Sequence, residues 1–277
     1  MIAHTPPIIS GSAHEELASP AVGVVLPVFN GAPTIAAAIR SIQQQTYTNW
    51  RLYVVNDRST DDTAALVQRA ADDDSRIQMV ECPERRGLPY VLNLGWKATT
   101  ESLVARADAD DVCLPERFAR QVEFLMSHPT VDVLGTGVEL ARDDGSDAGV
   151  HRRPADHAEL MKKLFRECPF MHPSVMMRRS FLEATGGYDE TLRAAEDYDL
   201  WLRGAHRHTY ANLQELLVRY TVSGNSFSTR WAHTVGASRL ILHHGAQHGR
   251  LLEGLFYSAR YLAAGVSTRL RLRRRRL

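Results

Sequence analysis

Three carboxylates stand within four consecutive residues, Asp108, Asp110 and Asp111, directly after the apolar run Leu103–Ala107. Like charges this close repel one another, and holding them after a buried strand costs stability unless a cation or a ligand offsets the charge. Oxygen ligands on a short loop suit a hard divalent ion, which completes its coordination with waters and substrate phosphates. The cluster therefore predicts a site for Mg²⁺ or Mn²⁺, although a DxD pattern alone is only moderately specific.

Two other apolar runs also end in polar residues. Asn30 follows Val22–Phe29, and Asp57 lies just beyond Leu52–Val55. Ligands of an open parallel sheet bind at the carboxyl ends of its strands, so Asp57 is expected to accept hydrogen bonds from a ligand in the crevice. The polar residues after it favour helix starts. We interpret them as a cap and a solvated first turn: Ser59, Thr60 and Asp62.

The elements that position these residues alternate between strand and helix from residue 22 to residue 140. Strands are expected at Val22–Phe29, Leu52–Val55, Ile77–Val80, Leu103–Ala107 and Val131–Leu140, with segments of helical periodicity between them. The alternation predicts an α/β fold with a mostly parallel, Rossmann-like central sheet and helices on both faces. Further on, helices are expected at Asp156–Glu167, after Arg178 and at Glu196–Ala205, and short strands at Pro173–Met177, Thr209–Leu213 and Leu216–Thr221. Two C-terminal helices follow.

Composition excludes several classes of protein. The 277 residues are 44% hydrophobic and 23% charged, which is typical of a globular chain and excludes a disordered or fibrous one. The cysteines are widely separated and form no CxxC pair, so neither a disulfide framework nor a zinc site is expected: they are Cys82, Cys113 and Cys168. The chain contains no GxxxxGK[ST] or GxGxxG motif, which argues against a phosphate-loop NTPase and a dinucleotide-binding oxidoreductase.

The formal net charge of +1 hides an uneven distribution. Six of the 33 basic residues lie in the last nine residues, so residues 1–268 carry 27 basic against 32 acidic residues, a net charge of −5. Arginine beside leucine, after an amphipathic helix with Phe256, Tyr257 and Tyr261, favours an anionic membrane surface as partner. A nucleic-acid arm and a disordered solvated end are the alternatives. No nucleic acid is expected, because the body is acidic and carries no helix-turn-helix or zinc-binding pattern.

Four blocks, in this order, resemble the family 2 glycosyltransferases of the GT-A fold, which are metal-dependent and inverting. They are VVLPVFNGAPTIAAAIRSIQQQT, LYVVNDRSTDDT, ARADADDVCLPERFARQVEFL and GGYDETLRAAEDYDLWLR, and they span roughly Val24–Arg203. Each block alone is common, whereas the set is highly specific. The resemblance implies a nucleotide-sugar donor whose base is held by Asp57 and by the turn after the first strand, with Pro27, Phe29 and Asn30.

The resemblance also implies how the diphosphate is held. Asp110 would coordinate the Mn²⁺ or Mg²⁺ that bridges it, and Asp108 would contact the ribose or the metal. His172 lies where the family often has a histidine, so it is either a metal or acceptor contact or a hydrogen-bonded structural residue. Arg85 and Arg86 either approach the phosphates or are solvated, and we assign only Arg86 to the donor.

Sugar transfer with inversion needs a carboxylate that takes the proton of the acceptor hydroxyl as its oxygen attacks the anomeric carbon. Glu196 and Asp197 fit this need, and the resemblance makes Asp197 the base, with Glu196 positioning the acceptor or tuning its neighbour. The alternative interpretation of Glu196 and Asp197 is an acid-rich helix start.

The chain departs from the family where Asn56, Asp57 and Arg58 replace two acids and a glycine. Because Arg58 could narrow the pocket, the base preference is left open.

Other residues with suggestive spacing are assigned structural roles. His243, His244 and His248 include an i, i+4 pair but lack a nearby acid or cysteine in the sequence, so we interpret them as a solvated helix face. Trp96 and Trp201 are expected in the core. Asp189 is assigned to a turn and Asp199 to a helix face.

The expected function is transfer of a sugar, from a UDP-sugar in our interpretation, to a hydroxyl of a glycan or lipid-linked acceptor in cell-surface polysaccharide synthesis. The alternatives are an inactive nucleotide-sugar or carbohydrate binder of the same fold and a nucleotidyltransferase, which would need a Gly-rich basic loop after the first strand. Without a secretory signal or an apolar span, the protein is expected in the cytoplasm or peripheral on the inner face of the membrane. The sequence leaves the sugar, the acceptor and the oligomeric state open.

Four segments are expected. Residues 1–20 form a flexible leader, and residues 21–225 form the GT-A domain, with a nucleotide-binding half at about 21–140 and an acceptor-side half at about 141–225. Residues 226–268 form the C-terminal helices, and residues 269–277 form the Arg-rich tail.

Overall fold

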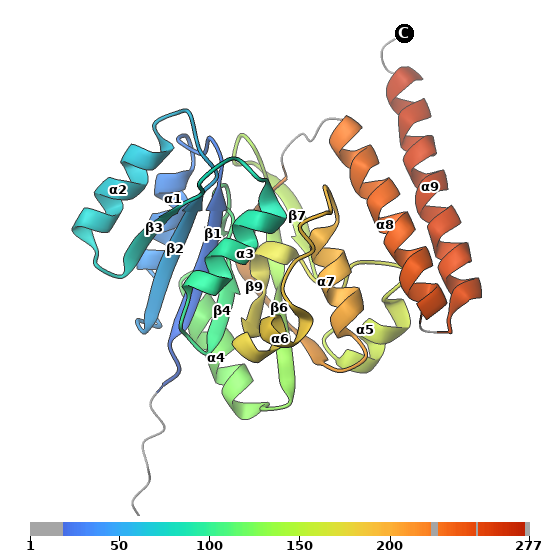
Figure 1. Cartoon of the computed structure of the whole chain (residues 1–277), viewed down its shortest axis with the longest axis horizontal. Helices are drawn as coiled ribbons and strands as arrows, with labels where there is room; N and C mark the ends of the chain where they lie inside the picture. Colours follow the sequence, from blue (N-terminus) through green and yellow to red (C-terminus); the bar gives the residue numbers. More distant parts are fainter. Residues whose placement is uncertain (1–18, 223–226, 248, 275–277) are drawn as a thin grey trace, which may run out of the picture.

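The structure, a computed structural model, describes residues 19–222, 227–247 and 249–274, with the backbone alone at 227–230 and 264–274. Strands and helices alternate through most of the chain (Figure 1). The elements are β1 (Val22–Val28), α1 (Ile35–Gln43), β2 (Trp50–Asn56), α2 (Thr63–Asp73), β3 (Ile77–Glu81), α3 (Leu88–Ala98), β4 (Leu103–Arg106), β5 (Val112–Cys113), α4 (Arg117–Ser127), β6 (Val131–Arg142), β7 (Asp147–His151), α5 (His157–Lys163), η1 (His172–Ser174), β8 (Met176–Arg178), α6 (Arg179–Thr185), α7 (Glu196–Gly204), β9 (Thr209–Val222), α8 (Phe227–Gln247) and α9 (Leu251–Arg274).

One sheet runs through the molecule in the order β3-β2-β1-β4-β8-β6-β9-β5, and β7 pairs with β6. The first four strands are parallel. The register pairs Val28 with Asn56 and Val25 with Arg106. The loops that follow β1, β2 and β4 therefore leave the sheet at the same edge, where ligands of such sheets bind.

The second half of the sheet is mixed. β8 is antiparallel to β4 and β6, whereas β9 is parallel to β6. The two short strands expected at residues 209–221 are one strand, β9, whose pairing with β6 shifts register around Gly137. The strand expected from Pro173 begins only at Met176, because the residues before it form a turn of 3₁₀ helix in which proline has no N–H to leave unpaired.

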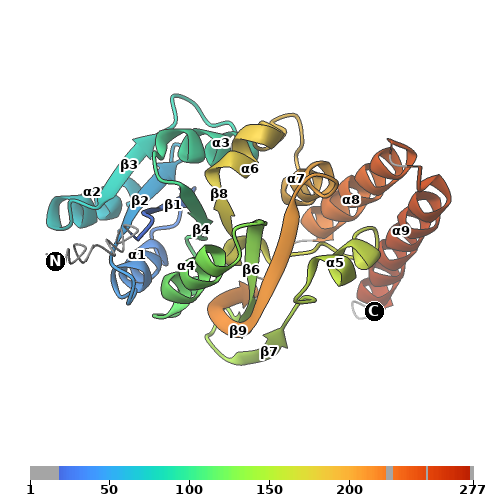
Figure 2. The same ribbon diagram turned by 90° about the horizontal axis from the view of Figure 1, so that it is seen from below.

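Helices cover both faces of the sheet, as predicted (Figure 2). The apolar sides of α1 and α4 pack on one face, in a core that contains Ile39 and Phe118. α3, α6 and α7 pack on the other face, where Trp96 and Trp201 are buried as expected. The α/β fold with additional C-terminal helices is thus confirmed.

A close contact holds α3 against the sheet. A Cβ atom on Gly95 would lie 2.9 Å from Cγ2 of Val55 and still closer to Cγ1 of Val25. We expect Gly95→Ala to lower the free energy of unfolding by about 1–3 kcal/mol, since the added methyl group forces the helix away from its core. Urea denaturation measures the effect, with the exposed neighbouring substitution Lys97→Ala as control. A Gly95→Ala variant as stable as the wild type would contradict this packing.

The last two helices form a hairpin beside the sheet domain. They cross at Gly245 and Gly254, where a Cβ atom on Gly245 would lie 3.0 Å from the Cα of Gly254. α9 continues to Arg274, so the first six residues of the predicted Arg-rich tail extend this helix. Residues 275–277, and all of the predicted leader except residues 19 and 20, lie outside the described residues. In the part of the chain that the structure covers, no helix is both long and apolar enough to cross a membrane.

Candidate active site

The loops after β1 and β2 hold each other in place. The backbone N–H of Asn30 donates to Oγ of Ser59 at 2.9 Å, and the N–H of Thr60 donates to Oδ1 of Asn30 at 2.8 Å. Ser59 and Thr60 therefore clamp the two loops together, which corrects their interpretation as a helix cap. Asn30 and Arg58 both have left-handed backbone conformations, with φ values of 51° and 61°. Glycine adopts such conformations without strain. This explains why the family has a glycine at the position of Arg58.

A pocket opens between these loops and α3. Its volume is about 130 Å³, and its lining combines apolar side chains with two carboxylates: Pro27, Val28, Phe29, Asp57, Leu88, Val91 and Asp108. Four of the residues assigned to the donor from the sequence line this one pocket, namely Pro27, Phe29, Asp57 and Asp108. An apolar cleft with a few fixed polar groups is the usual form of a small-molecule site.

Asp57 is held rigidly at the pocket wall. Its two carboxylate oxygens accept the backbone N–H groups of Arg86 and Gly87, at 3.0 and 3.1 Å. Gly87 has a φ of 86°, which glycine adopts without strain. Asp57 thus fixes the chain at the start of α3 and is largely buried in the pocket wall.

The two arginines that precede α3 point to different partners. The guanidinium group of Arg86 pairs with Glu84 at 3.3 Å and with Glu190 at 3.9 Å, and it lies over the ring of Tyr90. That of Arg85 lies 3.8 Å from the centre of the Phe29 ring, at the pocket. Neither arginine lines the pocket, but Arg85, which was not assigned to the donor, contacts the ring of Phe29, which does.

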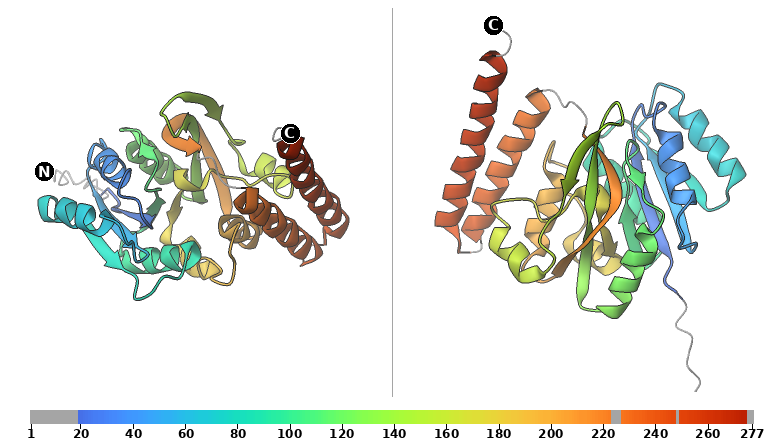
Figure 3. Two further views of the ribbon diagram at one scale, coloured as in Figure 1. Left: turned by 90° about the horizontal axis from the view of Figure 1, so that it is seen from above. Right: turned by 180° about the vertical axis from the view of Figure 1, so that it is seen from behind.

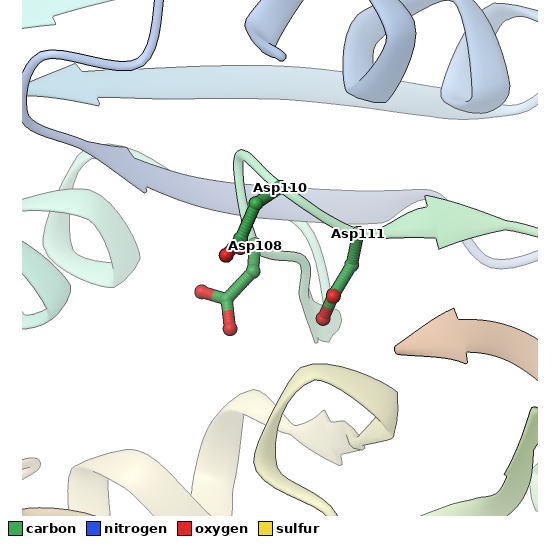
Figure 4. A group of neighbouring side chains, drawn as sticks. All are labelled: Asp108, Asp110 and Asp111. Atoms are coloured by element: carbon green, nitrogen blue, oxygen red, sulfur yellow. The ribbon is translucent and has the colours of Figure 1, made fainter. Parts of the chain in front are cut away.

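The three acids after β4 gather as the sequence predicts. Asp108, Asp110 and Asp111 each offer one oxygen, and these oxygens all lie within 4.8 Å of one another. Figure 4 shows the three side chains leaving the same loop toward one side. Asp108 and Asp110 were assigned to the metal from the sequence, whereas Asp111 was counted in the cluster but given no role.

Asp111 is the buried member of this cluster. Its Oδ1 accepts the backbone N–H of Thr221 on β9 at 2.8 Å, while its buried Oδ2 has no hydrogen-bond partner among the described residues. Burial, followed by the charge of Asp108, raises the pKa of Asp111 to about 8. An orphaned buried carboxylate oxygen beside two further carboxylates is a donor set that fits a hard divalent cation.

A buried arginine, Arg106, lies at the centre of the acidic residues. It is the last residue of β4, and its guanidinium group forms an ion pair with Asp108. Desolvation raises the pKa values of Asp111, Glu196 and Asp197, and the positive charge of Arg106 opposes this rise at each of them. No role was assigned to this residue from the sequence, although a charged side chain inside an apolar run, two positions before the acids, was a signal for one.

Glu196 and Asp197 form the first turn of α7. Ala195 before them has a left-handed φ of 61°, and a Cβ atom on Gly236 of α8 would lie 3.1 Å from the carbonyl oxygen of Ala194. α8 thus packs directly on the chain that leads into the acid pair. Desolvation, followed by the charge of Asp197, raises the pKa of Glu196 to about 7, and desolvation also raises that of Asp197. A raised carboxyl pKa is typical of groups that exchange protons.

His172 is engaged by a tyrosine. Its Nε2 lies 2.9 Å from the hydroxyl oxygen of Tyr188, and both residues are buried. Burial, followed by the charge of Arg106, holds the pKa of His172 well below its usual range, which keeps the ring neutral. The structure does not bring His172 into the aspartate cluster, so the geometry favours the hydrogen-bonded structural alternative.

One histidine of α8, His244, does not lie on the expected solvated helix face. His244 is buried, and its Nε2 lies 3.4 Å from Oδ1 of Asp199, whose Oδ2 accepts Nε–H of Arg203 at 2.7 Å. His244 is therefore not part of a solvated face, and Asp199 is a buried link between α7 and α8. His243 is exposed, as expected, and His248 lies outside the described residues.

Comparison with known proteins adds to this geometry. Residues 23–186 match the family described as Glycosyl transferase family 2. The putative glycosyltransferase EpsE of Bacillus subtilis (strain 168) is 34% identical over 216 residues, which cover 76% of each chain. The amylovoran biosynthesis glycosyltransferase AmsE of Erwinia amylovora is 30% identical over 193 residues, which cover 69% of this chain and 72% of the relative.

Two solved structures share the fold. S. aureus TarS 1-349 in complex with UDP-GlcNAc aligns with a TM-score of 0.66 and 17% identity, over 86% of this chain and 72% of TarS. The mannosyltransferase PcManGT from Pyrobaculum calidifontis, in complex with GDP-Man and Mn²⁺, aligns with a TM-score of 0.65 and 22% identity, over 91% of this chain and 76% of the other. The arrangement of sheet and helices is thus the GT-A fold.

Proposed function

The chain belongs to glycosyl transferase family 2, and from that premise we propose that it transfers a sugar with inversion from a UDP-sugar to a hydroxyl of a glycan or lipid-linked acceptor. One observation carries the proposal: the buried Arg106 pairs with Asp108, which lines the pocket and belongs to the acidic cluster, and the charge of Arg106 also acts on the Glu196–Asp197 pair, whose pKa values are raised. The relative AmsE is named for the synthesis of amylovoran. By analogy, we propose an acceptor in cell-surface polysaccharide synthesis.

The lining of the pocket suits a nucleotide as the part of the donor that binds there. Phe29 and the apolar residues around it provide a surface for a flat base, and Asp57 supplies a carboxylate at the pocket wall. The carboxylate of Asp108 lines the same pocket and belongs to the acidic cluster, so base and diphosphate would lie on either side of it. The two solved structures were determined with UDP-GlcNAc and with GDP-Man. We propose UDP as the base-bearing group of this chain's donor.

The diphosphate needs its charge offset as the sugar leaves. We propose that Asp110 and Asp108, with Asp111 behind them, hold a divalent cation, Mn²⁺ or Mg²⁺, which would neutralise that charge. Mn²⁺ accompanies GDP-Man in the PcManGT structure. The hydrogen bond from the N–H of Thr221 holds Asp111 in place, and β9 thereby helps to position the cluster.

The acid pair supplies the proton acceptor. The acceptor hydroxyl oxygen forms a bond to the anomeric carbon, its proton passes to the carboxylate of Asp197, and the carbon–oxygen bond to the diphosphate breaks with its electron pair on the diphosphate. No covalent sugar–protein intermediate forms. The N–H of Tyr198 donates to Oδ1 of Asp197 at 2.7 Å, and Sγ of Cys168 lies 3.8 Å from Oδ2, so the carboxylate has a fixed orientation. We propose residues 21–140 as the nucleotide-binding half and 141–225 as the acceptor side.

Metal-dependent nucleotide binding tests this assignment. We expect UDP to bind far more tightly in the presence of Mn²⁺, and Asp110→Asn to weaken that Mn²⁺-dependent binding by at least about tenfold, since the variant lacks a charged ligand. Titration calorimetry with UDP and GDP, each with and without Mn²⁺, measures the effect and compares the bases. The matched control is Asp73→Asn, which removes an exposed charge at the end of α2.

Two results would contradict the proposal in different ways. Equal UDP affinity with and without Mn²⁺ would remove the metal from the mechanism. Metal-dependent UDP binding without turnover, over a broad panel of glycan and lipid-linked acceptors, would favour the inactive binder.

A further inference from the structure

α9 presents large apolar side chains to solvent. Leu252 is 83% exposed, Phe256 61%, Leu255 48% and Leu262 37%. Their spacing of three, four and seven residues puts them on one side of the helix, which we call the outer face of α9. Gly254, Tyr257 and Tyr261 lie on the opposite side, toward α8 and the core.

No described element covers the outer face. α9 packs against α8 and is the outermost element of the molecule, with α8 between it and the sheet (Figure 3). Single exposed apolar residues are ordinary on protein surfaces, but a contiguous group of leucine and phenylalanine side chains marks an interaction site.

The charges on this helix indicate the kind of partner. Arg260 is exposed on α9, and the helix continues to Arg274 through a stretch in which arginine and leucine alternate. Residues 1–268 carry a net charge of −5, so the cationic stretch stands out against an acidic body. A helix with an apolar face and a cluster of arginines matches an anionic lipid surface, which offers an apolar layer beneath negative headgroups. On α9 itself a second copy of the chain would offer these arginines one carboxylate, that of Glu253, which already pairs with Arg250.

α9 runs in the same direction as the parallel strands. In Figure 1, β1 and α9 both run upward along the chain. The cationic end of α9 therefore lies at the same end of the molecule as the carboxyl ends of the parallel strands, where the donor pocket opens.

We propose that the outer face of α9 docks on the surface of an anionic bilayer, with the helix lying in the plane of the headgroups and its arginines contacting acidic lipids. The docking itself does not depend on the proposed function, because it uses no residue of the pocket or the acidic cluster.

Co-sedimentation of the full chain with vesicles tests the proposal. With equal parts of phosphatidylglycerol and phosphatidylcholine we expect binding that weakens with added salt, and with phosphatidylcholine alone at least about tenfold weaker binding. The double variant Leu252→Glu, Phe256→Glu is expected to bind the anionic vesicles at least about tenfold more weakly, because two apolar side chains no longer enter the bilayer. The matched control is Val150→Glu combined with Met126→Glu, which places the same two charges on exposed apolar sites of β7 and α4, outside α9.

Three results would overturn the proposal. One is unchanged vesicle binding by the double variant, provided that its melting temperature and its UDP binding match those of the wild type. Another is equal binding to neutral and anionic vesicles. The third is a wild-type dimer in light scattering that the double variant abolishes, which would assign the outer face to a second copy of the chain. Because UDP binding is measured separately, failure of membrane docking can be told apart from failure of the proposed function.

Discussion

Replacing Asp197 with asparagine is expected to lower the rate of sugar transfer by about 10²–10⁴-fold, the contribution of a general base, and to leave UDP binding intact. Asparagine keeps the shape of the side chain, and its amide oxygen can still accept the N–H of Tyr198, but it cannot take a proton at neutral pH. The measurement is release of nucleoside diphosphate with acceptor present, paired with calorimetry of UDP binding. Transfer by Asp197→Asn at the wild-type rate would exclude this residue as the base.

Glu196, the neighbour of Asp197, provides a second test through the pH dependence of the transfer rate. Glu196 faces Asp197, Arg106 and Asp108, and burial followed by the charge of Asp197 raises the pKa of Glu196 to about 7. A base works only when ionised, so the rate is expected to fall as the pH drops below about 7 and the acid pair takes up a proton. Glu196→Gln removes one negative neighbour, which lowers the pKa of Asp197 and shifts this acid limb to lower pH. An acid limb at the same pH in the wild type and the variant would show that the two carboxylates do not titrate together.

Much of the donor side follows from local sequence. Apolar runs identify the parallel strands, and strands paired in parallel register end at one edge, so Phe29, Asp57 and Asp108 could be predicted to meet although they lie far apart in the sequence. The prediction works because each strand is short and buried on both faces, and its first polar residue marks its end. Asp108, Asp110 and Asp111 are neighbours in the chain, and their clustering needed no tertiary information.

The residues that could not be placed are those whose partners come from distant elements. His244 lies 45 residues beyond Asp199, its acidic partner. Its i, i+4 spacing to His248 said nothing about that contact. The orientation of Asp111 depends on a backbone N–H of β9, 110 positions away. The side chain of Arg86 pairs with Glu190, whereas that of Arg85 lies over the ring of Phe29. Contacts made by the second half of the chain set these details, and that half has the less regular pattern.

Arg106 interacts both with an acid near it in the sequence, Asp108, and with acids of a distant helix, Glu196 and Asp197. Its removal should have the largest effect on stability. We expect Arg106→Met to lower the free energy of unfolding by about 3–5 kcal/mol, the usual cost of breaking a buried ion pair from one side. Methionine fills part of the space but leaves the charge of Asp108 without its partner, among carboxyl groups that burial already disfavours as ions. Urea denaturation without added metal measures the loss. The matched control is Arg51→Met, which removes a mostly exposed arginine from its ion pair with Glu101 and is expected to cost at most about 1 kcal/mol.

A double-mutant cycle separates the charge of Arg106 from its packing. If the loss comes from the unpaired carboxylate, then Asp108→Asn in the Arg106→Met background should recover part of the stability. The double variant should then lose less free energy of unfolding than the two single variants lose together. A purely additive cycle would mean that Arg106 stabilises the fold by filling space. The charge explanation would then fail for Glu196 and Asp197 as well, because their proton affinities are argued from the same guanidinium group. Stability and the pH profile of transfer are therefore expected to change together in Arg106→Met, since one buried cation balances the acids on both sides of the site.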